Sequence, residues 1–139
     1  MVDQNCAYCV EGDLVAKFGI KICELETSKV YLFKEQSHPG RCIVAHKKHV
    51  GDMNELTAEE RAAYFEDVAR VARAIMKAFN PDKVKYGAYG DTGHHLHFHL
   101  CPKYKDEFEW GGVFLMNPDK KYLTDAEYAE MIEKIKANM

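Results

Sequence analysis

The sequence has no run of apolar residues long enough to cross a bilayer. Its first residues, MVDQNCAYCVEGD, also lack the basic and then apolar order of a secretory signal. Both absences argue against a membrane protein, and we expect a soluble, cytoplasmic protein that does not bind membranes.

Basic residues are not in excess: 19 Lys and Arg stand against 22 Asp and Glu, which gives a formal net charge of −3. A protein that binds nucleic acids or anionic membranes would show the opposite balance. We therefore expect no nucleic-acid partner, although a local basic pocket for a small anion is compatible with this composition.

The chain also lacks internal repeats, low-complexity tracts and linkers rich in Pro, Gly or Ser. Its 139 residues are enough to bury a hydrophobic core without disulfide staples. The five cysteines are an odd number, and a reducing compartment disfavours disulfides. We expect a single domain over residues 1–139 without a disulfide framework.

The pattern of apolar residues and turns predicts both strands and helices. Strands are expected at 19–25, 29–33, 41–47, 83–89 and 95–101. Apolar residues at helical spacing predict one long helix at about 56–80 and a C-terminal helix at about 123–139, each preceded by a capping box. This order indicates an α+β fold around a mostly antiparallel sheet of about five strands.

Histidine is concentrated in one place, because four of the seven histidines lie within six positions of the stretch GDTGHHLHFHLCPKY at 90–104. Successive side chains of a strand point to opposite faces. A strand at 95–101 would therefore put His95, His97 and His99 on one face and Leu96, Phe98 and Leu100 on the other. We expect the apolar face to pack under the helix and the imidazoles to face a cleft, with His94 in the turn or on the opposite face.

This row of imidazoles has three interpretations. Packing alone is the least favoured, because three histidines in strict alternation with apolar residues are unusual. Two histidines at positions i and i+2 of a strand can chelate a metal ion. A neutral imidazole, with an ordinary pKa near ~6.5, can also attack phosphorus while its neighbours donate hydrogen bonds to the phosphate.

The stretch HLHFHLC at 95–101 resembles the His-x-His-x-His-x-x motif, with apolar x, of the histidine triad (HIT) family of nucleotide hydrolases and transferases. PGRCIVAHKKHVGDMNELTAEE at 39–60 is similar to the family's strand, Lys/Arg–His segment and long helix, and the resemblance covers about 6–104. It implies a HIT-like fold, with an antiparallel sheet, helices on one side and usually a homodimer.

The resemblance also implies roles for single residues. His97 would be the nucleophile that attacks an α-phosphate and is transiently nucleotidylated, and His99 would donate a hydrogen bond to the phosphate or the leaving group. Thr92 matches a Ser/Thr that contacts phosphate in the family. The backbone N–H groups of Gly90, Asp91 and Thr92 would bind the same anion.

A C-x-x-C sequence, Cys6 to Cys9, lies near the start of the chain, without the strand–helix context of a thioredoxin-like redox motif. Two free thiols and a zinc site both fit this spacing. Family members with this feature hold zinc with both cysteines, the histidine of the Lys/Arg–His segment and the first triad histidine. The implied ligands are Cys6, Cys9, His49 and His95. Four protein ligands would make the zinc structural and leave His97 free, whereas a catalytic zinc held by the three triad histidines would consume the nucleophile.

Several positions depart from the family pattern. Phe33 stands where many relatives have an Asp or Asn for the ribose hydroxyls, and it could stack on a base or fill the core. Arg41 replaces a histidine, His46 a proline and Lys85 an asparagine. Arg41 and Lys85 could suit a highly phosphorylated ligand or could be solvated charges at a strand edge.

We therefore expect a HIT-type nucleotide hydrolase that acts on a dinucleoside polyphosphate, a nucleoside phosphoramidate or a similar substrate through a nucleotidyl-histidine at His97. One alternative is a nucleotidyltransferase or phosphorylase that passes the adduct to a phosphate acceptor. Another is a nucleotide-binding or interaction module with little turnover, which Phe33 makes credible. A zinc-dependent hydrolase is the last alternative.

Overall fold

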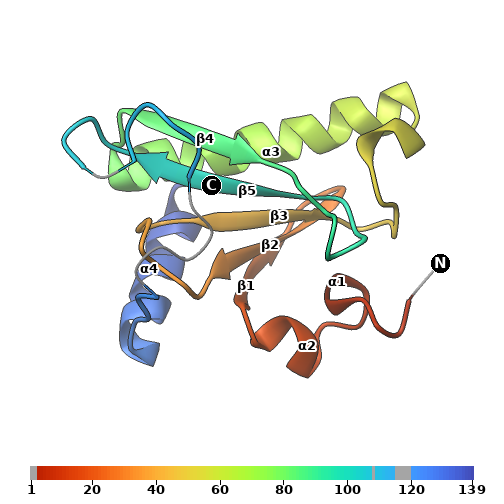
Figure 1. Ribbon diagram of the computed structural model, residues 1–139, viewed down its shortest axis with the longest axis horizontal. Coiled ribbons are helices and arrows are strands. Elements are labelled where there is room, and N and C mark those ends of the chain that lie inside the picture. The colour runs from red at the N-terminus through yellow and green to blue at the C-terminus, as the bar shows by residue number, and fades with distance from the viewer. Residues whose placement is uncertain (1–2, 108, 115–119) are drawn as a thin grey trace.

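The computed structural model describes residues 3–107, 109–114 and 120–139. In this part of the chain five strands form one sheet in the order β1-β2-β3-β5-β4, and each neighbouring pair is antiparallel (Figure 1). The strands are β1 (Gly19–Glu24), β2 (Ser28–Phe33), β3 (Cys42–His46), β4 (Lys83–Gly87) and β5 (His97–Lys103). The predicted α+β class and the five-stranded sheet are therefore confirmed.

The two predicted helices are present as α3 (Ala58–Phe79) and α4 (Asp125–Ala137). Thr57 and Thr124 cap them by accepting a hydrogen bond from the third backbone N–H of each helix, as the sequence predicts. A short 3-10 turn, η1 (Met53–Glu55), precedes α3. Both helices pack on the same face of the sheet, because their apolar residues belong to one buried cluster with the strands.

The apolar face of the triad strand lies in this cluster. Leu96 and Leu100 are buried in it and Phe98 packs against it, with the ring of Phe98 beside those of Tyr64 and Phe65 of α3. The alternation predicted for residues 95–101 is therefore confirmed on its apolar side, and the imidazoles of β5 are directed to the other face of the sheet.

That other face carries two short helices that the sequence analysis did not predict, α1 (Ala7–Val10) and α2 (Gly12–Ala16). Tyr8 and Val15 of these helices form a second apolar cluster with residues of β2 and β3. Figure 1 shows α1 near the loop that precedes β5. Helices of four and five residues have too few turns to give a periodic apolar pattern.

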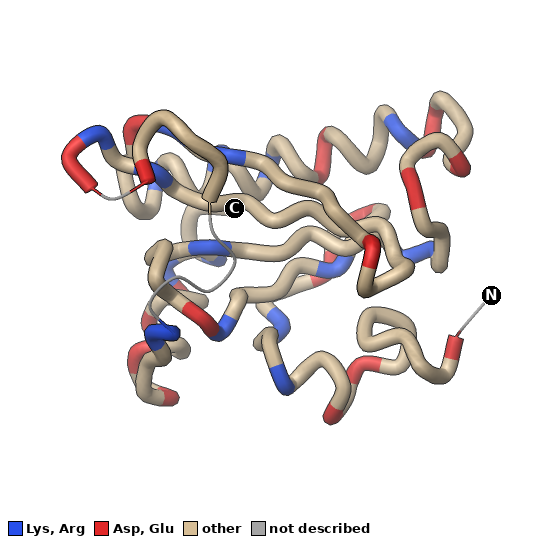
Figure 2. The backbone as a smooth tube through the Cα atoms, viewed as in Figure 1, with Lys and Arg blue, Asp and Glu red and all other residues tan. Residues whose placement is uncertain are grey.

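Charges of both signs are interspersed along the described chain rather than gathered in one tract (Figure 2). None of the described helices is both long and apolar enough to span a bilayer.

Candidate active site and metal cluster

A cleft of about 610 Å³ lies on the face of the sheet that carries α1. All three triad histidines line it, together with the loop at 89–94 and apolar side chains of α1, β2 and β3. His94 is exposed in that loop and lies close against Gly51, where a Cβ atom would collide with its ring. His94 therefore lies in the turn, as its position in the alternation predicts, and not in the row of triad imidazoles.

His97 lies in the middle of the row and has its hydrogen-bonding state fixed by the backbone. Its Nδ1 is 2.7 Å from the carbonyl oxygen of His95. A carbonyl only accepts, so Nδ1 carries the proton and Nε2 keeps a lone pair. Burial lowers the pKa of His97, so the ring is neutral at physiological pH. This is the form of imidazole that acts as a nucleophile.

His99 holds the opposite tautomer, because its Nδ1 faces a group that only donates. Nη2 and Nε of Arg41 lie 2.9 and 3.2 Å from this nitrogen. A guanidinium has no acceptor, so Nδ1 accepts and the proton of the neutral ring is on Nε2. Burial first, and then the charge of Arg41, lower the pKa of His99 to about 2, which keeps the ring neutral.

Arg41 itself is buried, with 0% of its surface exposed. Its guanidinium lies 4.2 Å from the ring centre of Phe33 and 5.0 Å from that of Phe114. The alternative that Arg41 is a solvated strand-edge charge is therefore wrong, because its side chain is buried against the rings of Phe33, from the neighbouring strand β2, and of Phe114. Lys85, in contrast, contacts Trp110 and Gly112 and does not line the cleft.

Phe33 borders the cleft and belongs to the buried cluster at the same time. The ring of His99 approaches it edge-on, with the ring centres 5.3 Å apart. Because Arg41 covers one face of the Phe33 ring, that face does not stack on a base. Of the two alternatives for Phe33, the structure thus favours packing.

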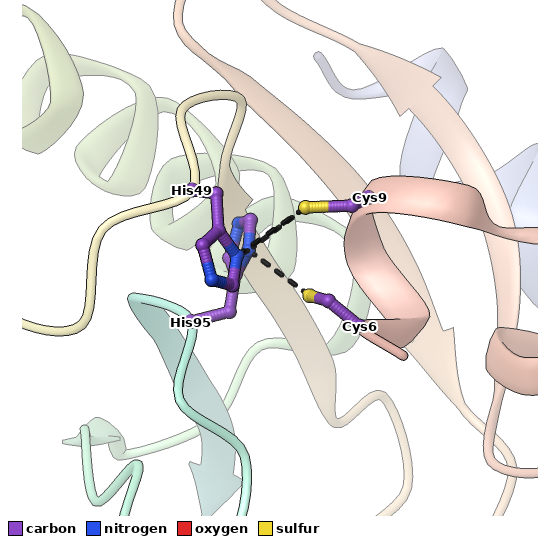
Figure 3. A group of neighbouring side chains, drawn as sticks. All are labelled: Cys6, Cys9, His49 and His95. Carbon is purple, nitrogen blue, oxygen red and sulfur yellow. Dashed lines mark hydrogen bonds between the residues drawn. The ribbon is translucent and has the colours of Figure 1, made fainter. Parts of the chain in front are cut away.

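A second set of side chains forms a compact cluster at one end of the cleft. The ligand atoms of Cys6, Cys9, His49 and His95 all lie within 4.8 Å of one another (Figure 3). Nδ1 of His95 is 3.2 Å from Sγ of Cys6 and 3.7 Å from Sγ of Cys9, and Nδ1 of His49 is 3.3 Å from Sγ of Cys9. The structure therefore brings the four residues together as the resemblance implies.

These distances suit a tetrahedral zinc ion. Bond lengths of about 2.3 Å to sulfur and about 2.0–2.1 Å to nitrogen put tetrahedral ligands roughly 3.3–3.8 Å apart. Nε2 of His95 lies 2.6 Å from the carbonyl oxygen of His46, to which it donates, so the Nδ1 lone pair is directed at the thiols. Burial lowers the pKa of His95 to about 4, which favours the neutral imidazole that binds metal.

The cluster depends on local backbone at both of its ends. Cys6 precedes α1 and Cys9 lies within it, so a single helical turn directs both thiols the same way. His95 lies just before β5, and its backbone N–H donates to Gly93 rather than to the ladder. His97 and His99 are not members of the cluster, which leaves the alternative of a zinc held by the three triad histidines without support among the described residues.

The predicted phosphate loop is also at the cleft. Gly90, Asp91 and Thr92 line it, and Gly90 has a φ of 73°, a left-handed conformation that favours glycine. The backbone N–H of Thr92 donates to the carboxylate of Asp91 at 3.2 Å. This amide is therefore engaged within the loop, and an anion would have to replace the Asp91 carboxylate to bind it.

Sequence reasoning missed Tyr8, whose ring lies 5.0 Å from that of His97 and 5.3 Å from that of His95. Its position between the two cysteines was the available signal, since a residue between two metal ligands would lie near a bound metal. The apolar residues Phe18 and Ile43 of the cleft were missed as well.

Comparison with known proteins supports the resemblance. The family model described as HIT domain matches residues 19–106. The protein called Protein hit from Bacillus subtilis is 28% identical over 123 residues, which cover 84% of this chain and 83% of that protein. Adenosine 5'-monophosphoramidase hnt1 from Schizosaccharomyces pombe is 28% identical over 116 residues, covering 77% and 80%. Bis(5'-adenosyl)-triphosphatase from Dictyostelium discoideum is 29% identical over 98 residues, covering 67% and 65%.

Solved structures share the fold. A histidine triad protein from Sinorhizobium meliloti superposes with a TM-score of 0.84 at 21% identity, over 92% of this chain and 95% of that one. A zinc-bound histidine triad family protein from Mycobacterium smegmatis gives a TM-score of 0.66 at 20% identity, over 96% and 91%. With a family model that matches more than half of its length, the chain belongs to the histidine triad family.

Proposed function

We propose that this protein is a nucleotide hydrolase that cleaves a phosphoanhydride or phosphoramidate bond at an α-phosphate through a covalent intermediate on His97. The observation that carries the proposal is the pair of opposite hydrogen-bond partners in one cleft: a carbonyl at Nδ1 of His97 and a guanidinium at Nδ1 of His99. They imply a lone pair on Nε2 of His97 and a proton on Nε2 of His99. The names of two relatives, an adenosine 5'-monophosphoramidase and a bis(5'-adenosyl)-triphosphatase, support this class of substrate.

In the first step Nε2 of His97 attacks phosphorus, a nitrogen–phosphorus bond forms, and the bond to the leaving group breaks with its electron pair. The leaving group keeps these electrons and, when it is an amine, takes a proton from solvent. The imidazole ring becomes positively charged in the adduct. The His95 carbonyl, which accepts from Nδ1 at 2.7 Å, stabilises this charge without any movement.

In the second step water attacks the adduct, and the nitrogen–phosphorus bond breaks with its electron pair returning to Nε2 of His97. The products are a nucleoside monophosphate and a proton. In both steps Nε2–H of His99 donates a hydrogen bond to an oxygen of the phosphate. The loop at residues 90–92 binds the same anion once the phosphate replaces the Asp91 carboxylate at the N–H of Thr92.

Cys6, Cys9, His49 and His95 hold a structural Zn²⁺ in this proposal. Four protein ligands leave no open position for water or substrate. When bound, the ion supplies rigidity, because it joins α1 to the residue that precedes β5. Support comes from the ligand spacing and from the zinc-bound structural neighbour.

The protein also acts as a homodimer in this proposal, through the open edge of β4 and the adjacent face of α3. Phe65, Met76 and Tyr86 are large apolar side chains with 39%, 41% and 51% of their surface exposed. Phe65 and Met76 lie on one side of α3 at helical spacing, and Met76 and Tyr86 border the same shallow groove. An apolar stripe beside a strand edge that no described strand pairs with is suited to a second copy.

The test is turnover of adenosine phosphoramidates and dinucleoside polyphosphates by the wild type and by His97→Ala. We expect release of a nucleoside monophosphate that falls by at least about a thousandfold in the variant, and a nucleotidyl adduct on the quenched wild type in mass spectrometry. Glu133→Ala, which changes an exposed side chain of α4 outside the cleft, is the control and should retain activity.

Other outcomes separate the alternatives. A nucleoside diphosphate formed only when inorganic phosphate is added would identify a phosphorylase. Equal or absent turnover in the wild type and His97→Ala, with both proteins folded, would reject the hydrolase and leave a binding module.

A further inference from the structure

The guanidinium of Arg41 is an unusual group to find behind a proposed active site. It is completely buried, and it lies between the rings of Phe33 and Phe114 rather than in the cleft. Burial of a charge is costly unless hydrogen bonds compensate for it. Two of its nitrogens lie 2.9 and 3.2 Å from Nδ1 of His99, so part of this compensation comes from the triad itself.

The contact has a chemical consequence because arginine only donates. A neutral residue such as glutamine in this place could donate to Nδ1 or accept from it, and would allow both tautomers of His99. Arginine allows only the one in which Nδ1 is bare and Nε2 carries the proton. Among the described residues no side chain or carbonyl hydrogen-bonds Nε2 of His99, and the ring lines the cleft.

The other tautomer would be harmful to phosphate chemistry. With the proton on Nδ1, the lone pair of Nε2 would face the cleft and repel the oxygens of a bound phosphate. His97 would then have no donor beside it, since its own Nε2 must also be unprotonated to attack. His97 can therefore act as nucleophile and His99 as hydrogen-bond donor only if the group that contacts Nδ1 of each ring fixes the required tautomer.

We propose that Arg41 is a positioning residue that holds His99 as the Nε2–H tautomer, so that a hydrogen-bond donor always faces the substrate phosphate. This proposal rests on the proposed hydrolase function. His97 has the complementary arrangement, because the backbone carbonyl of His95 holds its proton on Nδ1. One donor-only partner and one acceptor-only partner therefore set two neighbouring histidines to opposite roles.

Among the described residues, three side chains have a ring contact or a hydrogen bond with the ring of His99. Arg41 approaches from the residue before β3, His97 from two positions away on β5, and Phe33 from β2. Of these only Arg41 hydrogen-bonds a ring nitrogen of His99. Substitution of Arg41 alone should therefore allow His99 to adopt both tautomers.

The direct experiment is nitrogen-15 NMR of the zinc-loaded protein with labelled histidine, in which each ring nitrogen reports whether it carries a proton. The wild type should show His99 with a protonated Nε2 and a bare Nδ1. Arg41→Gln, which fits the same space and both donates and accepts, should show a mixture of tautomers or protonation at Nδ1. Arg41→Lys, a donor-only cation, should restore the wild-type pattern at least in part.

Kinetics of the same proteins give the second measurement. Arg41→Gln should lower kcat by about 10- to 100-fold with little change in KM, less than the roughly 100- to 1,000-fold loss for removal of a direct donor. Lys85→Met is the matched control, because it removes a cation from the neighbouring strand β4 that does not contact His99. It should leave the tautomer and kcat unchanged.

The two proposals fail in different ways. A wild type in which His99 carries its proton on Nδ1, or an Arg41→Gln variant with unchanged tautomer and kcat, would overturn the role of Arg41 while leaving hydrolysis intact. A wild type with the expected tautomer but without turnover would overturn the hydrolase instead. If Arg41→Gln does not fold, Arg41→Lys and the wild-type spectrum still test the proposal, because a proton on Nδ1 of His99 in the wild type would overturn it.

Discussion

The rings of Tyr8 and His97 lie 5.0 Å apart, although one is near the N-terminus of the described chain and the other is at the centre of the triad. Tyr8 stands between Cys6 and Cys9, whose thiols face His95. The segment that supplies half of the proposed metal ligands therefore also supplies a wall of the cleft.

Loss of zinc should weaken both the fold and substrate binding. Zinc should be present at one ion per chain by elemental analysis, and Cys9→Ser should lose it. Because a structural zinc contributes several kcal/mol, and each kcal/mol shifts the melting temperature of a chain this size by about 2–4 °C, we expect a decrease of roughly 10 °C. KM should rise, since Tyr8 is no longer held at the cleft.

Cys23→Ser is the matched control, because Cys23 is a partly buried free cysteine outside the cluster. A Cys9→Ser protein that retains stoichiometric zinc and its melting temperature would contradict the proposed ligand set.

Stability should depend on pH through His99. Its pKa is about 2 in the folded protein and about 6.5 when unfolded, so folding is opposed by protonation. The contribution of neutral His99 to the free energy of unfolding is fully present above pH 6.5. It is lost as pH falls from 6.5 toward 2, by about 1.4 kcal/mol per pH unit.

His99→Gln removes this group while its side-chain oxygen can still accept from Arg41. Between pH 7.5 and 5 the free energy of unfolding of the wild type should fall by about 2 kcal/mol more than that of His99→Gln. Urea unfolding of both proteins at the two pH values measures this difference. If the free energies of unfolding of the two proteins fell equally, His99 would already be protonated in the folded protein at pH 5.

The sugar of a nucleotide substrate should contribute little to recognition near His99. Phe33 and Ile43 make that part of the cleft apolar, and the carboxylates among the described residues that line the cleft are Asp3 and Asp91, both exposed. One lost hydrogen bond changes binding by about 0.5–1.5 kcal/mol. A 2',3'-dideoxy substrate, which loses no such bond, should therefore keep kcat/KM within about twofold of the ribose form.

A decrease of tenfold or more would instead show that another group binds the hydroxyls. Asp91→Asn would then identify whether the loop carboxylate is that group.

The proposed dimer should depend on the apolar stripe of α3. Met76→Glu places a charge between two copies and should give a monomer in light scattering after size exclusion. Ala129→Glu adds the same charge to the exposed side of α4 and should leave the assembly unchanged. A Met76→Glu protein with the wild-type mass would exclude this face as the interface.

Local physics explains how much of the fold the sequence could predict. The alternation of residues 95–101, the capping boxes of Thr57 and Thr124, and the apolar spacing of α3 all depend on near neighbours in the chain. The resemblance also predicted that Cys6, Cys9, His49 and His95 come together, because it joined positions that lie far apart in sequence, and their ligand atoms do lie close together.

The environment of Arg41 could not be predicted in this way. Its burial depends on two rings: Phe33, at the end of the neighbouring strand β2, and Phe114, which follows β5 in the sequence. A charged residue just before a strand is normally expected to be exposed to solvent. Only the tertiary structure shows that Arg41 is buried. Tyr8 was missed for a similar reason, since α1 is too short to show a pattern of its own.

The three triad histidines differ in the kind of group that fixes their tautomer. Main-chain carbonyls accept from Nε2 of His95 and Nδ1 of His97, and a main-chain carbonyl is present whatever side chain its residue carries. His99 relies on the side chain of Arg41, which a single codon change can replace. Substitutions can therefore leave the tautomers of His95 and His97 intact as long as the backbone path is kept. The tautomer of His99, in contrast, can be changed by a substitution at the single position 41.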